Sequence, residues 1–267
     1  MSTYKLIAVD MDDTLLDSDL NISPRVIEAV RKVREKGIHI TLATGRMFCS
    51  AKPYAQKLGI NLPLITYQGA LVKNALSEEV LLHRPVPLEL ARRVVAKIKE
   101  YRYHINVYID DTLYVEKITP EAEIYARISG IKAHPVGDLL QFLQQPPTKV
   151  LAVASEREID ELQREVKPLF GEQLHITKSK PQFLEFSHPR ATKGDALAML
   201  AEHFGVQRHQ VMAIGDGDND VEMLRYAGMG VVVGNAREEI KALAGYVAPS
   251  NDEDGVAEAL EKLVLNA

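Results

Sequence analysis

Carboxylates follow two short apolar runs of this 267-residue chain. Asp10 and Asp12 come directly after Leu6–Val9, and the segment Gly215-Asp-Gly-Asp-Asn-Asp220 comes directly after Val211–Ile214. Short continuous apolar runs are typical of strands that are buried on both faces. A carboxylate at the end of such a strand can act as a nucleophile, exchange a proton or bind a cation. The second segment combines four polar residues with two glycines, which is more than a turn requires.

Two further segments supply groups that could hold an anion. Thr44-Gly45-Arg46 follows the apolar run Ile38–Ala43 and offers a hydroxyl, a glycine that allows close approach to the backbone, and a cation. Lys193 lies in the first turn of a predicted helix, where the helix dipole disfavours a positive charge. A bound anion would remove that disadvantage. Taken singly, the first segment could be an ordinary turn and the lysine an ordinary surface residue.

The tetrapeptide Asp-Asp-Thr-Leu occurs twice, at residues 12–15 and at residues 110–113. The first copy follows a predicted parallel strand, and ligands of open parallel sheets bind beyond the carboxyl ends of the strands. The second copy lies between two short predicted strands, where Asp-Asp-Thr is suitable for a hairpin turn. We therefore assign chemistry to the first copy and assign Asp110 and Asp111 to a turn.

Other motifs of similar appearance do not fit. Alternate aspartates from Asp216 to Asp220 match the start of an EF-hand calcium loop. However, the required glycine is replaced by Val221 and the required glutamate by Ala227. A later glycine-rich segment has the wrong spacing for a dinucleotide fingerprint and precedes a strand, and the chain contains no G-x-x-x-x-G-K-[ST] phosphate loop. The eight histidines show no metal-ligand spacing.

The predicted elements that position these residues form an α/β core. The first seventy residues are predicted as β-α-β-α-β, with Leu64–Tyr67 as the third strand of a parallel sheet. The same alternation resumes near the C-terminus, whereas paired short strands beside helices occupy the middle of the chain. We predict a doubly wound, mainly parallel Rossmann-like core sheet in residues 1–83 and 189–267. Residues 84–188 are predicted to form an inserted α+β domain with proline-containing hinges at its two ends.

Together these segments resemble the haloacid dehalogenase-like (HAD) hydrolase superfamily, and most closely its Cof-type branch of small-molecule phosphatases. The resemblance covers nearly the whole chain. It rests on four motifs in the expected order: Asp10-Met-Asp-Asp-Thr14, Thr44-Gly45, Lys193, and Gly215-Asp216 with Asn219-Asp220. Asp13 replaces the commoner glycine of the first motif, a variation found in this branch. His188–Thr192 departs from the usual sequence before the lysine, which affects the predicted hinge and not Lys193.

These residues fit the chemistry of phosphoryl transfer. Asp10 is expected to attack phosphorus and form an aspartyl-phosphate, which splits one difficult step into two. Asp12 is expected to protonate the leaving oxygen and then to activate water. Crowding Asp10, Asp12 and Asp216 beside an anionic substrate requires a cation. Hard oxygen ligands together with a phosphate select Mg²⁺.

The resemblance implies the remaining roles. Asp10 and Asp216 would bind Mg²⁺ through their carboxylates and Asp12 through its carbonyl oxygen, while Asp220 steadies the site. The groups expected to hold the phosphoryl oxygens are the main chains of Met11 and Gly45 and the side chains of Thr44, Lys193 and Asn219. Arg46 is a candidate substrate contact.

The position of the insert, between Thr44 and Lys193, resembles that of a C2 cap domain of the α+β kind. Such caps are associated mostly with sugar phosphates and other small phosphoesters, and they close over the site and contact the leaving group. We therefore predict a Mg²⁺-dependent phosphatase that hydrolyses small phosphomonoesters through an aspartyl-phosphate. A hexose-phosphate phosphomutase and a non-catalytic sensor of phosphorylated ligands remain alternatives, and a dehalogenase would have little use for Asp12 and Asp216 together.

Composition limits the partners. A net charge of −5 without a basic stripe argues against nucleic acid and against an anionic membrane surface. The single cysteine, Cys49, cannot form an internal disulfide and fits a reducing cytoplasm. The chain shows neither a signal-peptide pattern nor an apolar run of the roughly 18 residues that a membrane helix needs. The expected partner is a small phosphorylated metabolite, and the sequence does not specify an oligomeric state.

Overall fold

The computed structural model describes residues 4–266, apart from the side chain of Ile128. The chain divides into two compact units. Unit 1 contains Met1–Gly45, Ala51–Leu82 and Thr192–Ala267, and unit 2 contains Arg46–Ser50 and His83–Ala191. The predicted insert of residues 84–188 falls within unit 2. The ends of the predicted core, residues 1–3 and 267, lie outside the described residues.

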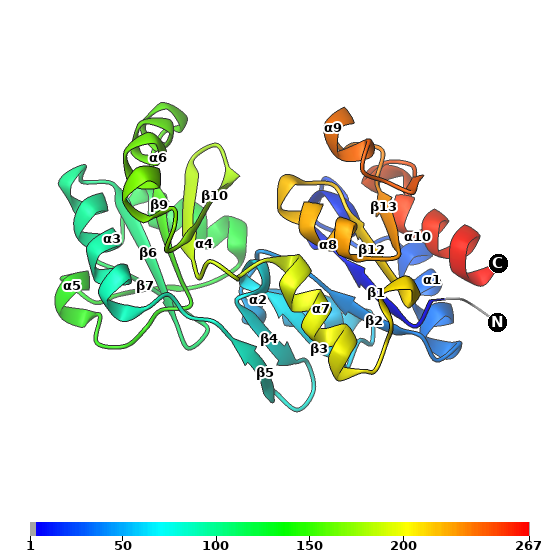
Figure 1. Cartoon of the computed structure of the whole chain (residues 1–267). Helices are drawn as coiled ribbons and strands as arrows, with labels where there is room; N and C mark the ends of the chain where they lie inside the picture. The colour runs from blue at the N-terminus through cyan, green and yellow to red at the C-terminus, as the bar shows by residue number, and fades with distance from the viewer. Residues whose placement is uncertain (1–3, 267) are drawn as a thin grey trace. The chain divides into compact units, whose positions relative to one another are not determined.

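Unit 1 is built on a five-stranded sheet with the strand order β14-β13-β12-β1-β2 (Figure 1). The strands are β1 (Leu6–Val9), β2 (His39–Leu42), β12 (Val211–Gly215), β13 (Met229–Val232) and β14 (Tyr246–Val247). All neighbours are parallel, with Val9 opposite Ile214 on one side and opposite Leu42 on the other. β1 and β12 are buried along their whole length. The predicted α/β fold with a mainly parallel core sheet is confirmed.

Two of the helices of unit 1 begin at residues whose side chains cap them. The helices are α1 (Pro24–Glu35), α2 (Phe48–Lys57), α7 (Lys193–His203), α8 (Val221–Tyr226), α9 (Glu238–Lys241) and α10 (Gly255–Leu260). At α1 the Ser23 hydroxyl accepts a hydrogen bond from the Val26 N–H, and at α7 the Thr192 hydroxyl accepts one from the Asp195 N–H. α7 packs against α8 in one buried apolar cluster with β1 and β12, which fixes the start of α7 near the ends of these strands.

The third predicted strand lies outside the parallel sheet. Within the described residues, β3 (Pro63–Thr66) meets that sheet through one bridge, between Ala43 and Ile65. It pairs instead with antiparallel β4 (Leu71–Asn74), and β5 (Val80–His83) completes a three-stranded sheet. The prediction of β3 as a full member of the parallel sheet is therefore wrong. The physical reason is a tight turn at Tyr67–Gly69, where three successive residues have positive φ and reverse the chain.

Unit 2 contains a six-stranded sheet with the order β10-β11-β9-β6-β7-β8. The strands are β6 (His104–Ile109), β7 (Thr112–Val115), β8 (Ala133–Pro135), β9 (Lys149–Val153), β10 (His175–Lys180) and β11 (Phe183–Ser187). All pairs are antiparallel except β7 with β8. The predicted mainly antiparallel sheet is confirmed, and β8 was not predicted.

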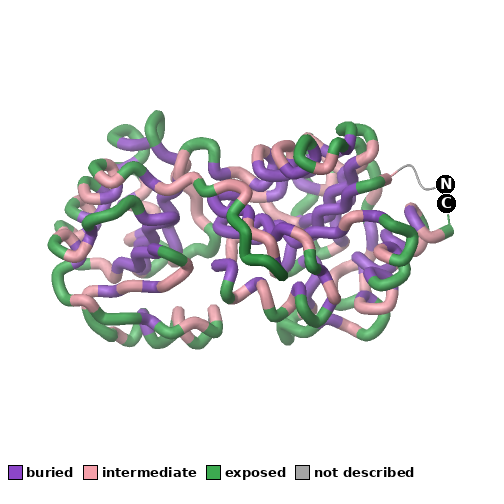
Figure 2. The backbone as a smooth tube through the Cα atoms, turned by 90° about the horizontal axis from the view of Figure 1, so that it is seen from below, coloured by how far each residue is buried: buried purple, intermediate pink, exposed green. Residues whose placement is uncertain are grey.

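The two faces of the unit 2 sheet differ. The helices of the unit are α3 (Leu88–Glu100), α4 (Pro120–Ser129), α5 (Leu139–Phe142) and α6 (Glu156–Phe170). α3 and α6 cover one face with an apolar core. Figure 2 shows the buried residues of the chain in purple. The other face carries a buried ion pair between Lys149 and Glu185, at 3.2 Å, and Tyr108, whose hydroxyl donates to that of Tyr125 in α4 at 2.6 Å.

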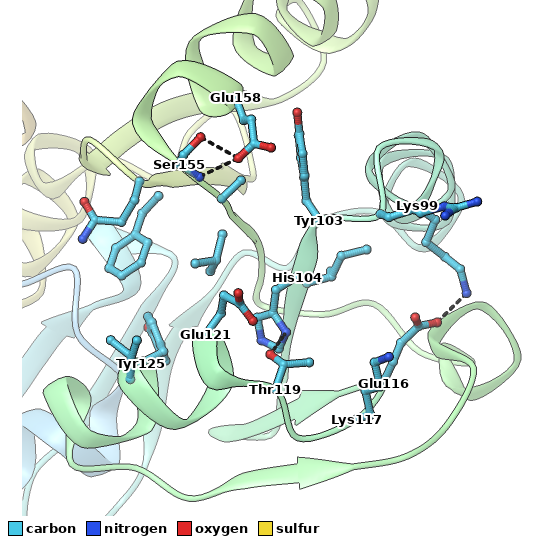
Figure 3. A pocket seen from close by; sticks show the side chains of 17 residues that line it. Lys99, Tyr103, His104, Glu116, Lys117, Thr119, Glu121, Tyr125, Ser155 and Glu158 are labelled. Carbon is cyan, nitrogen blue, oxygen red and sulfur yellow. Dashed lines mark hydrogen bonds and ion pairs between the residues drawn. The ribbon is translucent and has the colours of Figure 1, made fainter.

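A cavity of about 960 Å³ lies within unit 2 (Figure 3). Its lining includes His104, whose ring contacts the Thr119 hydroxyl, and Ser155, which caps α6 by bonding Glu158. None of the predicted site residues lines it. In the part of the chain that the structure describes, no helix is long and apolar enough to cross a membrane.

Candidate active site

Three of the predicted carboxylates, those of Asp10, Asp216 and Asp220, meet at the carboxyl ends of β1 and β12. The Asp10 N–H donates to the Ile214 carbonyl at 2.9 Å, which extends the pairing of the two strands by one step. Asp10 therefore leaves the sheet beside Asp216, which follows Gly215 at the end of β12. Asp10 is buried, with 5% of the residue exposed, so the strand end is shielded from solvent.

After Asp10 the chain makes a tight turn that brings Thr14 back to the site. Asp12 has an extended backbone, with φ −70° and ψ 133°, and Asp13 is left-handed, with φ 58°. The buried Thr14 hydroxyl donates to Asp216 Oδ1 at 2.6 Å. The turn is fixed from outside by Asn235, whose side-chain amide donates to the Asp13 carbonyl at 2.7 Å. The first copy of Asp-Asp-Thr-Leu thus contributes the Thr14 side chain to the cluster, and the role of Asp12 stays a prediction.

Lys193 places a positive charge between two of the carboxylates. Its ammonium is completely buried and lies 2.5 Å from Asp10 Oδ1 and 2.7 Å from Asp220 Oδ1. Lys193 begins α7, as predicted, where the helix dipole disfavours a positive charge. The two carboxylate contacts offset this unfavourable interaction. A buried charge is stable only when it is paired in this way.

Asp220 joins the two ends of its own loop. Its Oδ2 accepts hydrogen bonds from the N–H groups of Asp216, at 3.0 Å, and of Gly217, at 2.9 Å. With Lys193 on Oδ1, both oxygens of this fully buried carboxylate have protein donors. A β-carbon at Gly215 would lie 2.6 Å from Asp220 Cγ, so only glycine leaves room for this arrangement.

The electrostatics of the cluster indicate too little positive charge. Burial, followed by repulsion from Asp220, raises the pKa of Asp10 well above its usual value, although Lys193 opposes the shift. Burial also raises the pKa of Asp216 to about 6, with repulsion from Asp220 adding to it and the bond from Thr14 opposing it. Burial alone would lower the pKa of Lys193, but Asp10 and Asp220 together raise it. One ammonium does not balance three carboxylates.

These carboxylates are suitably placed for a divalent cation. Asp10, Asp216 and Asp220 each offer a carboxylate oxygen, and the three oxygens lie within 4.8 Å of one another. Asp220 already uses both of its oxygens. Among the described residues, no protein group bonds the second oxygen of Asp10 or of Asp216. The donor set is hard oxygen only, which suits Mg²⁺, and a cation would relieve the repulsion that raises both pKa values.

The predicted phosphate-binding residues line the neighbouring strand ends. Thr44 is fully buried and follows β2, where the Ala43 N–H donates to the Val9 carbonyl at 2.9 Å. The Thr44 N–H donates to the Ile65 carbonyl at 2.8 Å, which holds the Thr44–Gly45 segment on β3. Asn219 lies in the loop after β12, and its side-chain amide donates to Gln68 Oε1 at 3.1 Å.

The structure brings most of the predicted residues into unit 1 but separates one. Unit 1 contains Asp10, Met11, Asp12, Thr44, Gly45, Lys193, Asp216, Asn219 and Asp220. Arg46 belongs to unit 2, so its contact with a substrate stays a prediction. Two residues of the site were not predicted. Thr14 could have been found from its place in the first motif, whereas Gln68 has no sequence signal because its role depends on the unpredicted turn after β3.

The matching family model covers residues 7–260 and describes a haloacid dehalogenase-like hydrolase. The chain belongs to the haloacid dehalogenase-like hydrolase family. The HMP-PP phosphatase of Serratia proteamaculans is 31% identical over 90% of this chain and 87% of its own. The 5-amino-6-(5-phospho-D-ribitylamino)uracil phosphatase of Bacillus subtilis is 29% identical over 96% of both chains. A haloacid dehalogenase-like hydrolase of Bacteroides thetaiotaomicron has a crystal structure that matches 97% of this chain and 99% of its own, with 32% identity and a TM-score of 0.91.

These similarities confirm the predicted superfamily and the predicted class of enzyme, a phosphatase-type hydrolase. The residues matched by the family model include both strand ends that carry the carboxylates, and also α7 with Lys193. The buried cluster described above therefore lies in the part of the chain that is similar to the family.

Proposed function

We propose that this chain is a Mg²⁺-dependent phosphatase that hydrolyses small phosphomonoesters through an aspartyl-phosphate on Asp10. The observation that carries the proposal is the buried contact of the Lys193 ammonium with Asp10 and Asp220. This contact orients the Asp10 carboxylate and leaves its second oxygen without a protein donor among the described residues. An oriented and incompletely bonded carboxylate is what a nucleophile requires.

The chemical steps follow from the positions of Asp10 and Asp12. A carboxylate oxygen of Asp10 attacks phosphorus, and the bond from phosphorus to the leaving oxygen breaks as that oxygen takes a proton from Asp12. Asp12 then removes a proton from water, whose oxygen attacks the same phosphorus and releases phosphate from Asp10. Asp12 is half-buried, whereas Asp10 is buried, and this difference suits a group that must exchange protons with water.

The residues present fit the Mg²⁺ ion that this chemistry needs. Asp10 and Asp216 would bind it through their carboxylates and Asp12 through its carbonyl oxygen, as the family resemblance implies. When bound, the ion neutralises negative charge on the carboxylates and on the phosphoryl group. Asp220 acts differently, since both of its oxygens already accept bonds from Lys193 and from the loop, and it holds these groups in place.

Thr44, Lys193 and Asn219, with the main chains of Met11 and Gly45, would hold the phosphoryl oxygens. The named relatives support small phosphorylated metabolites as the substrate class, because one acts on HMP-PP and another on a phosphorylated ribityl compound, as their names state. Unit 2, with residues 84–188, would act as the cap that contacts the leaving group.

The decisive experiment measures phosphate release from a small aryl phosphate with and without Mg²⁺. Removal of the metal by a chelator should abolish turnover, and added Mg²⁺ should restore it. Asp10→Asn should lower kcat on the order of 10³-fold or more, because the nucleophile is lost. Asp218→Asn is the matched control, since Asp218 lies in the loop after β12 but is exposed and paired with Arg237. Near-normal turnover of Asp10→Asn would contradict the proposal.

Two further readouts separate the remaining alternatives. Acid quenching during turnover, followed by peptide mass analysis, should find one phosphoryl group on the peptide that contains Asp10. Incubation with a hexose phosphate should give free phosphate and no isomerised sugar phosphate, whereas a mutase would return the phosphoryl group to the sugar. Tight binding of a sugar phosphate without any phosphate release in Mg²⁺ would instead indicate a sensor.

A further inference from the structure

The turn after β3 is held in a strained conformation inside unit 1. Tyr67 and Gln68 have φ values of 52° and 58°, and Gly69 follows with 101°. Tyr67 is fully buried and Gln68 is 5% exposed. A left-handed conformation at a residue other than glycine is unfavourable and persists only where the surroundings enforce it. Two such residues in succession, both buried, need a reason.

The position of Gly69 explains how the turn is enforced. A β-carbon at this residue would lie 2.2 Å from the carbonyl oxygen of Thr192, the residue that caps α7. The turn is therefore pressed against the start of the helix that carries Lys193. It cannot relax outward without moving the N-terminus of α7.

The Gln68 side chain points from this turn to two segments of the candidate active site. Its Oε1 accepts a hydrogen bond from the Asn219 side chain at 3.1 Å. Its amide nitrogen occupies the space that a side chain at Gly45 would need, since a β-carbon there would lie 2.5 Å from Nε2. The Gln68 main chain also holds the same segment, because its N–H donates to the Thr44 carbonyl at 3.0 Å.

Gln68 therefore contacts Thr44, Gly45 and Asn219. These are three of the residues that we propose bind the phosphoryl oxygens of the substrate. Thr44 and Gly45 follow β2, whereas Asn219 follows β12, and β1 lies between these strands. The hydrogen bonds of a parallel sheet join its strands, and the spacing of two loops that leave it on either side of β1 depends on further contacts. A buried side chain that reaches both can fix that spacing.

We propose that Gln68 is a positioning residue, which sets the distance between the Thr44–Gly45 segment and Asn219 so that both can hold one phosphoryl group. This inference rests on the proposed function of the same site. It accounts for the strained turn, because the left-handed residue at position 68 directs its side chain to Asn219 and Gly45. It also explains why position 45 is glycine, since any larger residue would displace the amide.

The test is a double-mutant cycle of Gln68→Met and Asn219→Ala, with kcat and KM measured on a small aryl phosphate. Methionine keeps the length of the side chain and loses the hydrogen bond. Gln68→Met alone should lower kcat about 10- to 100-fold, because misplacing groups around the reacting atoms costs rate. In the Asn219→Ala background the same change should have a much smaller effect, since the residue that Gln68 positions is gone. Gln56→Met, an exposed change in α2, is the matched control.

A purely structural role predicts a different pattern. The melting temperature of Gln68→Met would then fall, kcat per folded molecule would stay within about twofold of the wild type, and the effects of the two changes would multiply; this result would overturn the inference. If Gln68→Met does not fold, Gly45→Ala replaces it, because its new methyl group displaces the Gln68 amide. Gly45→Ala should then lower kcat in the wild-type background and have a much smaller effect in the Asn219→Ala background, and equal effects in the two backgrounds would count equally against the inference.

The outcome is separable from that of the proposed function. If the wild-type protein releases no phosphate from any phosphomonoester, the proposed function fails. If the wild type is active and Asp10→Asn is not, but Gln68→Met keeps full kcat, the positioning role alone fails.

Discussion

The two copies of Asp-Asp-Thr-Leu adopt partly similar conformations and lie in different surroundings. In both, the second aspartate is left-handed, with φ of 58° at Asp13 and at Asp111. In both, the leucine is buried, at Leu15 and at Leu113. The tetrapeptide therefore has a common tendency to turn, which agrees with the preference of Asp for left-handed backbone.

The threonine shows where the copies differ. Thr14 is 1% exposed and donates to Asp216, 202 residues away in the chain. Thr112 donates, at 3.4 Å, to the carbonyl of Asp110 in its own turn. The first copy follows a central parallel strand, so its side chains meet those at the end of β12. The second copy joins antiparallel β6 and β7, as predicted, and Ile109 lies opposite Thr112. The strand before the tetrapeptide, and not the tetrapeptide, determines its role.

The second copy nevertheless does more than turn the chain. The carboxylate of Asp111 accepts hydrogen bonds from the N–H groups of Phe48, at 3.0 Å, and Cys49, at 2.7 Å. These residues form the first turn of α2 and belong, like Asp111, to unit 2. Asp111 therefore satisfies donors that a helix leaves free at its N-terminus. The sequence predicts only a turn at Asp111, because its contact with α2 depends on the fold.

The largest expected difference between the copies is at their first aspartate. Asp12→Asn should lower kcat on an aryl phosphate by about 10²-fold or more, because the proton-transfer group is lost. The circular dichroism spectrum should be unchanged, because Asp12 is half-buried and lies in the turn after β1, outside the sheet. Asp13→Asn is the matched control, because Asp13 is exposed and asparagine tolerates its left-handed backbone. Equal losses in the two variants would mean that the turn, and not the Asp12 carboxylate, is required.

The threonines provide the next comparison. Thr14→Val removes the hydrogen bond to Asp216 and should lower kcat/KM about tenfold at neutral pH, as expected for a bond to a charged group. Thr112→Val should leave kcat/KM unchanged, since its long contact is local. If both variants lose activity equally, the Thr14 contact has no special role.

The pH dependence of Thr14→Val sharpens this test. The bond from Thr14 lowers the pKa of Asp216, which burial raises to about 6, so its loss should raise that pKa further. Metal binding needs the deprotonated carboxylate. As the pH is lowered from 8 to 6, the Mg²⁺ concentration needed for half-maximal activity should increase in both proteins. In Thr14→Val this increase should begin at a higher pH than in the wild type. An unchanged pH dependence of Mg²⁺ activation would show that the bond does not control this carboxylate.

Much of the site could be predicted because it follows from strand ends. Buried runs such as Leu6–Val9 locate those ends, and a lysine at the start of a helix signals a nearby anion. The anions proved to include Asp10 and Asp220 of the protein itself. The contacts of Gln68 and Asp111 could not be predicted, because each residue lies in a left-handed turn and bonds residues that are distant in sequence. The edge strand β5 was missed since it is short and partly exposed, with Val80 at 52% exposure, and so lacks a hydrophobic pattern.

Asp111 should affect stability and not chemistry. Asp111→Ala should destabilise the protein by about 1 kcal/mol, because the N–H groups of Phe48 and Cys49 lose their acceptor. In thermal unfolding this corresponds to a fall of roughly 2–4 °C in the melting temperature. Asp111→Asn keeps one acceptor oxygen and a residue suited to left-handed backbone, so it should lose less. A tenfold fall in kcat on the aryl phosphate, with the melting temperature unchanged, would contradict this assignment.

The smallest effect is expected at Asp110, the counterpart of Asp12. Its φ of 50° suits asparagine as well as aspartate, and its Oδ2 accepts a hydrogen bond of 3.3 Å from the exposed side chain of Gln145. Asp110→Asn keeps a side-chain oxygen in the turn and should change neither the melting temperature nor kcat. The aryl phosphate is the appropriate substrate, because its small leaving group makes the measurement a test of bond breaking and not of leaving-group recognition. A fall in kcat of about 10²-fold, with circular dichroism unchanged, would mean that the second copy takes part in the chemistry after all, and that the strand preceding the tetrapeptide does not decide its role.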